Sequence, residues 1–573
     1  MTKRKNMNKI LALMISGMLA VTALTGCGNG KQADVSAETS SGADTLQSSG
    51  EEKEKLVVAI QTYNYITDYD DNYLTHMLED ALNVDIEFYL LSADSTEAKT
   101  QLSLMVSANQ ADLPDIICTG ALSAETILEY GSKGVFVDLT DMMSNPEITP
   151  NFNAIESEED KESMLKAATS ADGKIYSMVQ FAPATWNMTP YRMYINQVWL
   201  DKLNLSMPVT TEEYYETLKA FATQDPNGNG VNDEIAAYGF SAGTYGENIT
   251  IPLMNSFVYY PASNISNVKL TLDETGTKVI APFLEDGWRQ GLEYMHKLCA
   301  EGLLPESVFT DDKTQFMSVL NNEEVNLVGS LSTGSLSRWN DYDNNANGQE
   351  YEMMPALEGP DGTSYAVFLP YTPSPIWFVT SNCKNPELAA KLGDLFYRSD
   401  ISTSARYGAE GTDWSQAQED VNNESYSNAY IEAGLCEKTS AVILHDLWAE
   451  NNSTIWRDMN PRYTPVDYAN GFVNATEYDP TVKSVYFYAD NYKYYYDKHP
   501  EHLLPNLTYT TEEAQEQAEV VTNISSYLGE SMAQFITGAR PLTDKEWENY
   551  KKELNDMGLQ IWLENAQAAF ERN

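Results

Sequence analysis

The chain has 573 residues, and its 84 Asp and Glu outnumber its 36 Lys and Arg to give a formal charge of −48 at pH 7. A field this negative argues against binding to nucleic acid and against direct adhesion to anionic lipid. None of the five cysteines forms a Cys-x-x-Cys pair, which gives little support to a metal or redox centre. The four beyond Cys27 are predicted to be buried free thiols, with one disulfide as the alternative.

The first residues are typical of a secretory signal segment. Lys3, Arg4 and Lys5 precede an apolar run over 10–24 that is too short to span a bilayer. The sequence Leu-Thr-Gly-Cys at 24–27 resembles the lipobox of bacterial lipoproteins. The resemblance implies that residues 1–26 are removed and that Cys27 receives a diacylglyceryl thioether with acyl chains such as palmitate. Two acyl chains suffice for stable anchoring. An ordinary signal peptide with a chance cysteine is the alternative.

The segment 27–55 is predicted to be a flexible linker behind this anchor. It is rich in Gly, Ser, Ala, Thr, Glu and Lys and almost lacks large apolar residues. Such a segment cannot bury enough apolar surface to offset the entropy lost on ordering. The folded body is therefore expected to begin near Leu56.

Short apolar runs then alternate with amphipathic stretches. Strands are expected at 56–60, 84–91 and 114–117, and helices at 73–82 and 96–108. This alternation predicts an α/β layer with a mostly parallel sheet. No Gly-x-Gly-x-x-Gly follows the first strand, which argues against a dinucleotide-binding domain.

Six segments, taken in order and spacing, resemble those of the large extracellular solute-binding lipoproteins that serve ABC sugar importers in Gram-positive bacteria. These segments are Asp112–Ile117, Gly134–Leu139, Asp172–Tyr176, Trp199–Leu203, Tyr407–Gly411 and Phe535–Gly538. Each is weak alone, and together they extend the resemblance from Leu56 to the end of the chain.

The resemblance implies a periplasmic-binding-protein-like fold of two α/β lobes with a ligand cleft between them and a mainly helical C-terminal part. The first lobe is expected to contain 56–177 and 370–425, and the second 178–369 and 426–573. The expected function is capture of a carbohydrate, and more specifically of an oligosaccharide, at the extracellular face of the cell membrane. The expected partners are ABC permease subunits, the chain is expected to be a monomer, and no catalysis is expected.

The segment 225–234 resembles the start of an EF-hand calcium loop. Oxygen-bearing side chains stand at positions one, three and five, and Gly230 stands at position six, where the chain must bend sharply. Position twelve is Ala236, so the usual bidentate Glu is absent, and the resemblance to the solute-binding family implies acids at positions nine and ten instead. The predicted ligands of a structural Ca²⁺ are Asp225, Asn227, Asn229, Val231 through its carbonyl, Asp233 and Glu234. A solvated turn without metal is the alternative.

Aromatic side chains are the second group of candidates, because sugar rings stack their CH faces on Trp and Tyr. Those placed where strand ends should meet the cleft, together with one neighbouring arginine, are Tyr63, Tyr65, Trp186, Trp339, Trp414, Trp456 and Arg457. Core packing is the alternative for each of them. It is the favoured prediction for Trp199, Trp547 and Trp562, which stand at helical spacing.

Two rival functions remain, namely a surface enzyme and a carrier of a peptide or another solute. Residues 239–243 fit the Gly-x-Ser-x-Gly elbow of esterases, but poor helix-forming residues follow the serine, which argues against an elbow. A surface hydrolase or lyase that degrades polysaccharide would need a pair of carboxylates. Because the chain has 84 acids, close pairs are expected by chance and do not indicate such a site. A peptide- or other solute-binding homologue is the second rival.

Overall fold

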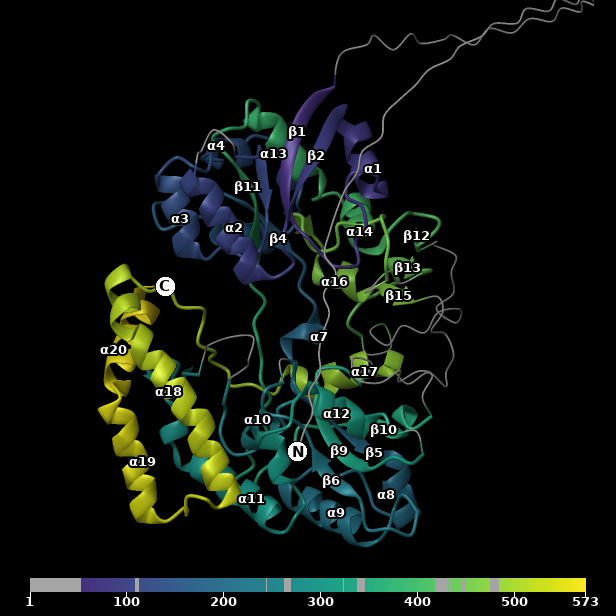
Figure 1. The fold of residues 1–573 in the computed structure, drawn as a ribbon, viewed down its shortest axis with the longest axis vertical. Coiled ribbons are helices and arrows are strands. Elements are labelled where there is room, and N and C mark those ends of the chain that lie inside the picture. The colour runs from purple at the N-terminus through teal and green to yellow at the C-terminus, as the bar shows by residue number, and fades with distance from the viewer. Residues whose placement is uncertain are drawn as a thin grey trace, which may run out of the picture. The chain divides into compact units, whose positions relative to one another are not determined.

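The computed structural model describes residues 53–572 except for 109–112, 244, 262–268, 323, 337–345, 418–430, 432–433, 446, 448–449 and 475–483. The predicted signal segment, Cys27 and Trp339 lie outside the described residues. Residues 53–573 form one unit by their contacts. This unit contains two larger sheets with their helices, which we call the first and second lobes and describe one at a time (Figure 1).

The first lobe is built on a six-stranded sheet of order β14-β4-β11-β3-β1-β2. β1 pairs in parallel with β2 and β3, and β11 runs antiparallel to β3 and β4. The carboxyl ends of β1 and β3 therefore lie at the same edge, where open α/β sheets bind ligands. The strands are β1 (Glu54–Gln61), β2 (Val84–Leu91), β3 (Ile116–Cys118), β4 (Met178–Phe181), β11 (Ser374–Val379) and β14 (Arg462–Tyr463).

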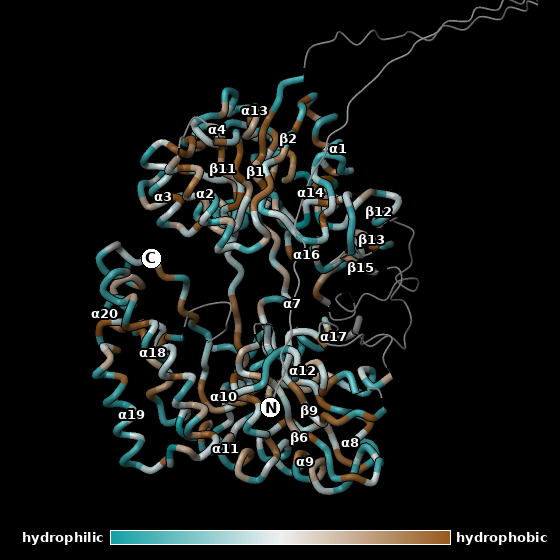
Figure 2. The backbone as a smooth tube through the Cα atoms, viewed as in Figure 1, coloured by the Kyte–Doolittle hydropathy of each residue, from teal (hydrophilic) through white to brown (hydrophobic). Residues whose placement is uncertain are grey.

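Side chains of β1 alternate between two hydrophobic cores, as the two-residue period of a strand requires. Figure 2 shows the hydrophobic stretch along this strand. Val58 and Ile60 face one core, to which the following helices contribute: α1 (Tyr73–Leu82), α5 (Pro150–Asn153), α6 (Glu158–Ala168), α13 (Pro386–Leu395) and α14 (Ser399–Tyr407). Ala59 faces the other core, under α2 (Ser95–Ala108) and α3 (Ala124–Ser132).

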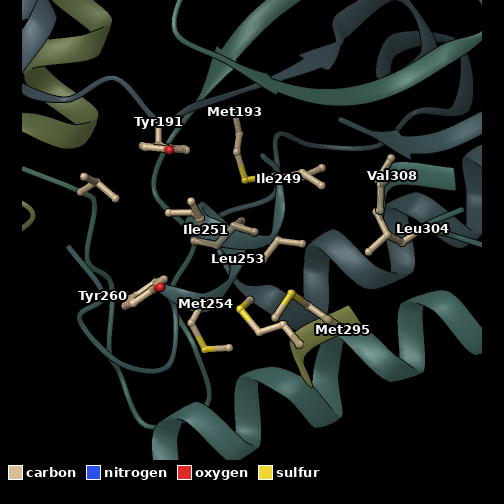
Figure 3. Packing of buried hydrophobic residues seen from close by; sticks show 14 of the residues in the cluster. Tyr191, Met193, Ile249, Ile251, Leu253, Met254, Tyr260, Met295, Leu304 and Val308 are labelled. Atoms are coloured by element: carbon tan, nitrogen blue, oxygen red, sulfur yellow. The ribbon is translucent and has the colours of Figure 1, made fainter. Parts of the chain in front are cut away.

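The second lobe is built on a four-stranded sheet of order β10-β5-β9-β6. Figure 3 shows part of its core, where Met193, Leu253, Met254 and Met295 come together. The strands are β5 (Arg192–Asn196), β6 (Ile235–Tyr238), β9 (Val328–Thr333) and β10 (Tyr351–Met354). The helices of this part of the chain are α8 (Gln197–Leu203), α9 (Thr211–Thr223), α10 (Thr250–Met254), α11 (Asp286–Ala300) and α12 (Lys313–Leu320).

From Ser484 onward the C-terminal part is mainly helical, as predicted. It contains α17 (Ser484–Asn491), a π-helical turn at Tyr492–Tyr496, α18 (Thr511–Thr537), α19 (Asp544–Asp556) and α20 (Leu559–Arg572). A capping box begins α18, since the Thr510 hydroxyl accepts from the Glu513 amide and Glu513 reciprocates. The predicted core positions of Trp199, Trp547 and Trp562 are confirmed, because all three are buried in the second-lobe core.

The lobe boundary predicted at residue 177 is wrong by one strand. β4 (Met178–Phe181) pairs with β11 and therefore belongs to the first sheet. The chain leaves this sheet after Phe181, and a short helix, α7 (Thr185–Met188), precedes β5 in the second sheet. Strand pairing joins residues almost 200 positions apart, which is why local pattern could not place this boundary.

The return to the second lobe predicted after residue 425 is also wrong. β14 (Arg462–Tyr463) pairs with β4 in the first sheet. Before and after it, a small sheet joins β12 (Trp414–Gln416), β13 (Ala441–Ile443) and β15 (Phe472–Asn474). Residues 441–474 therefore carry short strands, where the sequence had predicted a mainly helical segment, and α16 (Val466–Asn470) is a single short turn of helix.

The four described cysteines, Cys118, Cys299, Cys383 and Cys436, are free thiols. In the part of the chain that the structure describes, no helix has both the length and the apolar composition needed to cross a membrane.

Candidate functional site

Two of the predicted ligand residues follow β1 at the carboxyl edge of the first sheet. Tyr63 and Tyr65 are half-buried, and their ring centroids lie 5.5 Å apart. The hydroxyl of Tyr69 accepts a hydrogen bond of 3.1 Å from the Tyr63 amide, which fixes this turn. Tyr63 also lines a surface depression of about 350 Å³ formed by residues 62–64, 66–70 and Leu90.

Beside this pair lies an arginine cluster, which we define as Arg406, Arg457 and Arg462 around Asp458. Arg406, at the end of α14, pairs with Oδ1 of Asp458. Nη1 of Arg462 lies 3.0 Å from the same oxygen, and Nε of Arg457 lies 3.6 Å from Oδ2. Three guanidinium groups thus share one carboxylate. Only Arg457 of these four was predicted from the sequence as a ligand residue.

The pKa values within the arginine cluster reflect the excess of three guanidinium groups over one carboxylate. Burial by itself raises the pKa of Asp458, but Arg406, Arg462 and Arg457 outweigh it and hold this pKa far below its usual range. Burial and repulsion from Arg406 lower the pKa of Arg457 to about 10. Arg457 therefore stays charged near neutral pH, in an environment where cations repel one another.

The backbone at Arg457 is in the left-handed region, with φ 61°. A residue with a Cβ enters this region at a cost of about 1–2 kcal/mol, so the surrounding structure must impose it. Trp456 on one side is fully buried, and on the other side Nδ2 of Asn460 donates 2.7 Å to the Arg457 carbonyl. These contacts hold the backbone of Arg457, whose Nε lies 3.6 Å from Oδ2 of Asp458.

The arginine cluster lies near two of the segments that connect the first sheet to the second. Nε2 of Gln180, in β4, donates 2.8 Å to the Asp458 carbonyl. The Tyr371 hydroxyl, just before β11, donates 3.0 Å to the Gln180 carbonyl and accepts 2.7 Å from the Ala182 amide. Gln180 of β4 is therefore hydrogen-bonded both to the segment that carries the arginine cluster and to Tyr371 in the segment before β11.

In the second lobe, Trp186 of α7 forms an aromatic platform with Tyr488 of α17. Their ring centroids lie 4.6 Å apart, and Tyr488 is 40% exposed. The guanidinium carbon of Arg192 lies 3.4 Å from the centroid of the Trp186 ring. Arg192 is fully buried and donates to Oδ1 of Asn491, at 2.6 Å, and to the carbonyls of Gly334 and Trp186. Trp186 is thus held on a rigid support while its ring stays partly accessible.

Polar groups adjoin this platform. The Tyr245 hydroxyl donates 2.7 Å to Oδ1 of the exposed Asn187, the neighbour of Trp186. The Tyr245 amide in turn donates 2.7 Å to Oε2 of Glu247, whose side chain is fully buried. An aromatic face next to amide and hydroxyl groups suits a sugar, which presents CH faces and hydroxyl groups together.

Trp414 and Trp456 do not join these groups. Trp414 is 1% exposed in a small core with Ala441 and Ile443, and its Nε1 donates 3.0 Å to the Gly408 carbonyl. Trp456 is 0% exposed in the first-lobe core, and its Nε1 donates 2.9 Å to the Thr75 hydroxyl. Both indole N–H groups are satisfied inside the fold, so burial favours the core-packing alternative at these two positions.

The predicted calcium loop connects α9 to β6, as the sequence suggested. Asp225 has φ 47°, and Gly228 and Gly230 have φ 77° and 78°, so the chain turns tightly here. The Asp225 carboxylate accepts from the amides of Gly228, at 2.9 Å, and Gly230, at 3.1 Å. Nζ of Lys202, in α8, donates 2.6 Å to the Pro226 carbonyl and ties the loop to the lobe.

The acids of this loop fit a cation. Both carboxylate oxygens of Glu234 are sealed from solvent without a hydrogen-bond partner. Burial raises its pKa, and the nearby carboxylates of Asp225 and Asp233 raise it further. Among the described residues, no three His, Cys, Asp or Glu side chains hold a metal by themselves. The loop would have to add amide and carbonyl oxygens, which Ca²⁺ accepts.

The esterase elbow is not formed. Ser241 lies in a turn, its hydroxyl is 3.5 Å from the Phe309 carbonyl, and the next helix in the described residues begins only at Thr250. The helix that must follow an elbow serine directly is missing.

The sequence missed Arg406, Arg462, Asp458 and Tyr488. Arg406 lies in the last turn of a helix, where a cation is common for another reason, since it complements the helix dipole. Tyr488 lies in a Tyr-rich run that looks uniform in the sequence. Only the approach of α17 to α7 (Figure 1), and of the end of α14 to Asp458, distinguishes these side chains.

Residues 74–412 match the model of the bacterial extracellular solute-binding protein family. Since the match spans more than half of the chain, the protein belongs to this family. The fold is the two-lobe α/β fold of such proteins, as predicted.

Individual relatives agree with this assignment. The fructooligosaccharide ABC transporter substrate-binding protein FusA of Streptococcus pneumoniae serotype 4 is 24% identical over 521 residues, covering 87% of this chain and 86% of FusA. An HMO-binding, ABC-transporter-associated solute-binding protein from Bifidobacterium longum infantis superposes with a TM-score of 0.71 at 20% identity, covering 91% of this chain and 99% of that one. A FusA EF-hand mutant in complex with fructo-nystose gives 0.68 at 22% identity, with the same coverage.

Proposed function

We propose that the protein captures an oligosaccharide outside the cell and delivers it, unaltered, to the permease subunits of an ABC importer. The observation that carries this proposal is the aromatic platform of Trp186 and Tyr488, which is rigidly supported, partly exposed and bordered by polar groups. Tyr63 and Tyr65 offer a second aromatic surface at the carboxyl edge of the first sheet. A ligand that touches both lobes stabilises their closed arrangement by its differential contacts.

The relatives support the same proposal. FusA is described as a fructooligosaccharide carrier, and the solute-binding protein from Bifidobacterium as HMO-binding. Their identity with this chain is low, so they favour the class of ligand and leave its linkage and length open. Anchoring through Cys27 at the extracellular face of the membrane, and a monomeric state, belong to the proposal.

Incubation with a panel of neutral and acidic oligosaccharides tests this function. At least one saccharide is expected to raise the melting temperature of the purified protein, and chromatography is expected to return that saccharide intact. Release of shorter products would favour a polysaccharide-degrading enzyme instead. Stabilisation by peptides and by no saccharide would favour a peptide carrier.

Truncation of the platform should weaken binding much more than it weakens folding. Trp186→Ala is expected to reduce the affinity for the bound saccharide by about thirtyfold, which corresponds to roughly 2 kcal/mol for loss of a central aromatic contact. Isothermal titration calorimetry measures this change. Trp186→Phe, which keeps a ring, should recover most of the affinity, and Tyr89→Ala, on the exposed part of β2, should change nothing. Equal affinities for Trp186→Ala and the unmodified protein would contradict this role.

We also propose that the loop 225–234 holds a structural Ca²⁺. The oxygens of Asp225, Asn227, Asn229, Asp233 and Glu234 and the Val231 carbonyl would form its ligands. The ion would supply positive charge for the acids of the loop, and Glu234 would gain the partner that it lacks. The FusA structure described as an EF-hand mutant supports a related loop in that protein.

A further inference from the structure

The arginine cluster is unusual in a chain of this composition. Only ten of the 573 residues are arginine, and three of these ten share Asp458. The formal charge of the four side chains is +2, within a protein whose formal charge is −48. A local positive charge of this kind can attract an anion that the negative field of the whole chain would otherwise repel.

The arginine cluster is also reachable at one side. The side chains of Arg457 and Arg462 are 4% and 5% exposed, whereas those of Arg406 and Asp458 are 31% and 24% exposed. The two buried arginines therefore supply fixed positive charge, and Arg406 offers part of its guanidinium to a ligand. Guanidinium groups in a fixed orientation bind carboxylates through two parallel hydrogen bonds.

Tyrosines surround the arginine cluster. The charges of Arg457, Arg406 and Asp458 act on Tyr63, and those of Arg462 and Asp458 act on Tyr371. Tyr407 lies beside Arg406, with the guanidinium carbon 5.7 Å from its ring centroid. A positive charge surplus bordered by tyrosine rings presents two kinds of contact, one for an oxyanion and one for the face of a sugar ring.

We propose that the arginine cluster is an anion subsite of the ligand cleft, and that the captured oligosaccharide carries a carboxylate, as in a uronic acid. The inference rests on the proposed capture of a saccharide. The sugar carboxylate contacts Arg406, and its negative charge offsets the positive charge that Asp458 alone does not neutralise. A saccharide without an acid group leaves that surplus uncompensated, so the subsite discriminates against it.

Matched pairs of sugars test this subsite. The probes are oligogalacturonides of two to six units and the same oligomers after reduction of each carboxylate to a hydroxymethyl group. The acidic member is expected to bind at least tenfold more tightly, since hydrogen bonds between charged partners are about twice as strong as neutral ones. This preference should shrink as sodium chloride is raised.

Variants at the two ends of α14 give a matched comparison. Arg406→Gln is expected to lower the affinity for the acidic member by tenfold or more and to leave that for its reduced counterpart within about twofold. Arg398→Gln, at the start of the same helix and paired with Asp400 on the surface, should leave both affinities unchanged. The melting temperature of each variant without ligand shows whether it is folded. If Arg406→Gln does not fold, Arg406→Lys is tested in its place.

The outcomes separate this inference from the proposed function. Tighter binding of the reduced oligomers, or of a sulfated oligosaccharide, would overturn the carboxylate subsite while leaving saccharide capture in place. Full retention of the acidic preference in folded Arg406→Gln would also overturn it. Absence of binding to every saccharide tested would overturn the proposed function itself.

Discussion

Replacing Trp456 with alanine is expected to lower the free energy of unfolding by about 3–5 kcal/mol, the range found when a large aromatic is removed from a core. The indole is fully buried, makes an edge contact with the Phe88 ring at 5.1 Å between centroids, and donates to the Thr75 hydroxyl. Its removal leaves a cavity and removes the hydrogen bond that the Thr75 hydroxyl accepts, although this hydroxyl still donates 2.7 Å to the Tyr69 carbonyl. Chemical denaturation of the mature chain measures the loss.

A milder variant separates packing from binding at this position. Trp456→Phe keeps a ring in the core and loses the hydrogen bond, so it should be less destabilising than Trp456→Ala and should keep the saccharide affinity. Trp186→Ala is expected to show the opposite balance, with a large loss of affinity and a smaller loss of the free energy of unfolding than Trp456→Ala causes, because Trp186 is only partly buried. If Trp456→Phe abolished binding at unchanged stability, this result would support the sequence-based prediction of Trp456 as a ligand residue.

Removal of calcium is expected to lower the melting temperature and to leave saccharide affinity almost unchanged. A ligand present at a hundred times its dissociation constant stabilises the folded state by about 2.7 kcal/mol, and a chelator removes this contribution. The loop connects α9 to β6 and is hydrogen-bonded to Lys202 of α8, whereas the aromatic platform and the arginine cluster are built on other elements, so saccharide affinity should not depend on the metal. Differential scanning calorimetry with calcium and with chelator measures the difference.

The effect of Glu234→Gln on stability should have opposite signs with and without calcium. In calcium the variant is expected to be less stable than the unmodified chain, because a ligand oxygen with charge is lost. In chelator it is expected to be more stable, because a sealed carboxylate near Asp225 and Asp233 no longer has to ionise. The calcium site would be contradicted if Glu234→Gln changed the stability in the same direction under both conditions. It would also be contradicted if chelator left the melting temperature of the unmodified chain unchanged.

The same carboxylate gives the chelated protein a pH dependence of definite sign. The pKa of Glu234 is raised in the folded state, so the folded chain holds this proton more tightly than the unfolded chain. Its contribution to stability is therefore complete below the ordinary pKa of glutamate and is lost as pH rises through the raised value. The decrease in melting temperature caused by chelator should accordingly be smaller near about pH 5 than near about pH 8.

Local elements of this protein follow from local pattern. The helix Tyr73–Leu82 and the strand Val84–Leu91 have the bounds that the sequence predicted, and Asn83 between them adopts the left-handed backbone that ends a helix, with φ 53°. The loop 225–234 was also visible, because its residue types and spacing are themselves the signal for a cation. Family membership followed from the order of short segments along the chain.

The tertiary structure decided which residues act together. β4 and β14 belong to the first sheet because each pairs across a long stretch of chain, and no local period records such pairing. Trp186 and Trp456 look alike in the sequence, yet one rests on Arg192 at a partly open surface and the other fills a core. Arg406 meets Asp458 only because α14 ends beside the residues that precede β14. Charge and periodicity act along the chain, whereas burial and the sharing of one carboxylate by three arginines exist only after distant segments have packed.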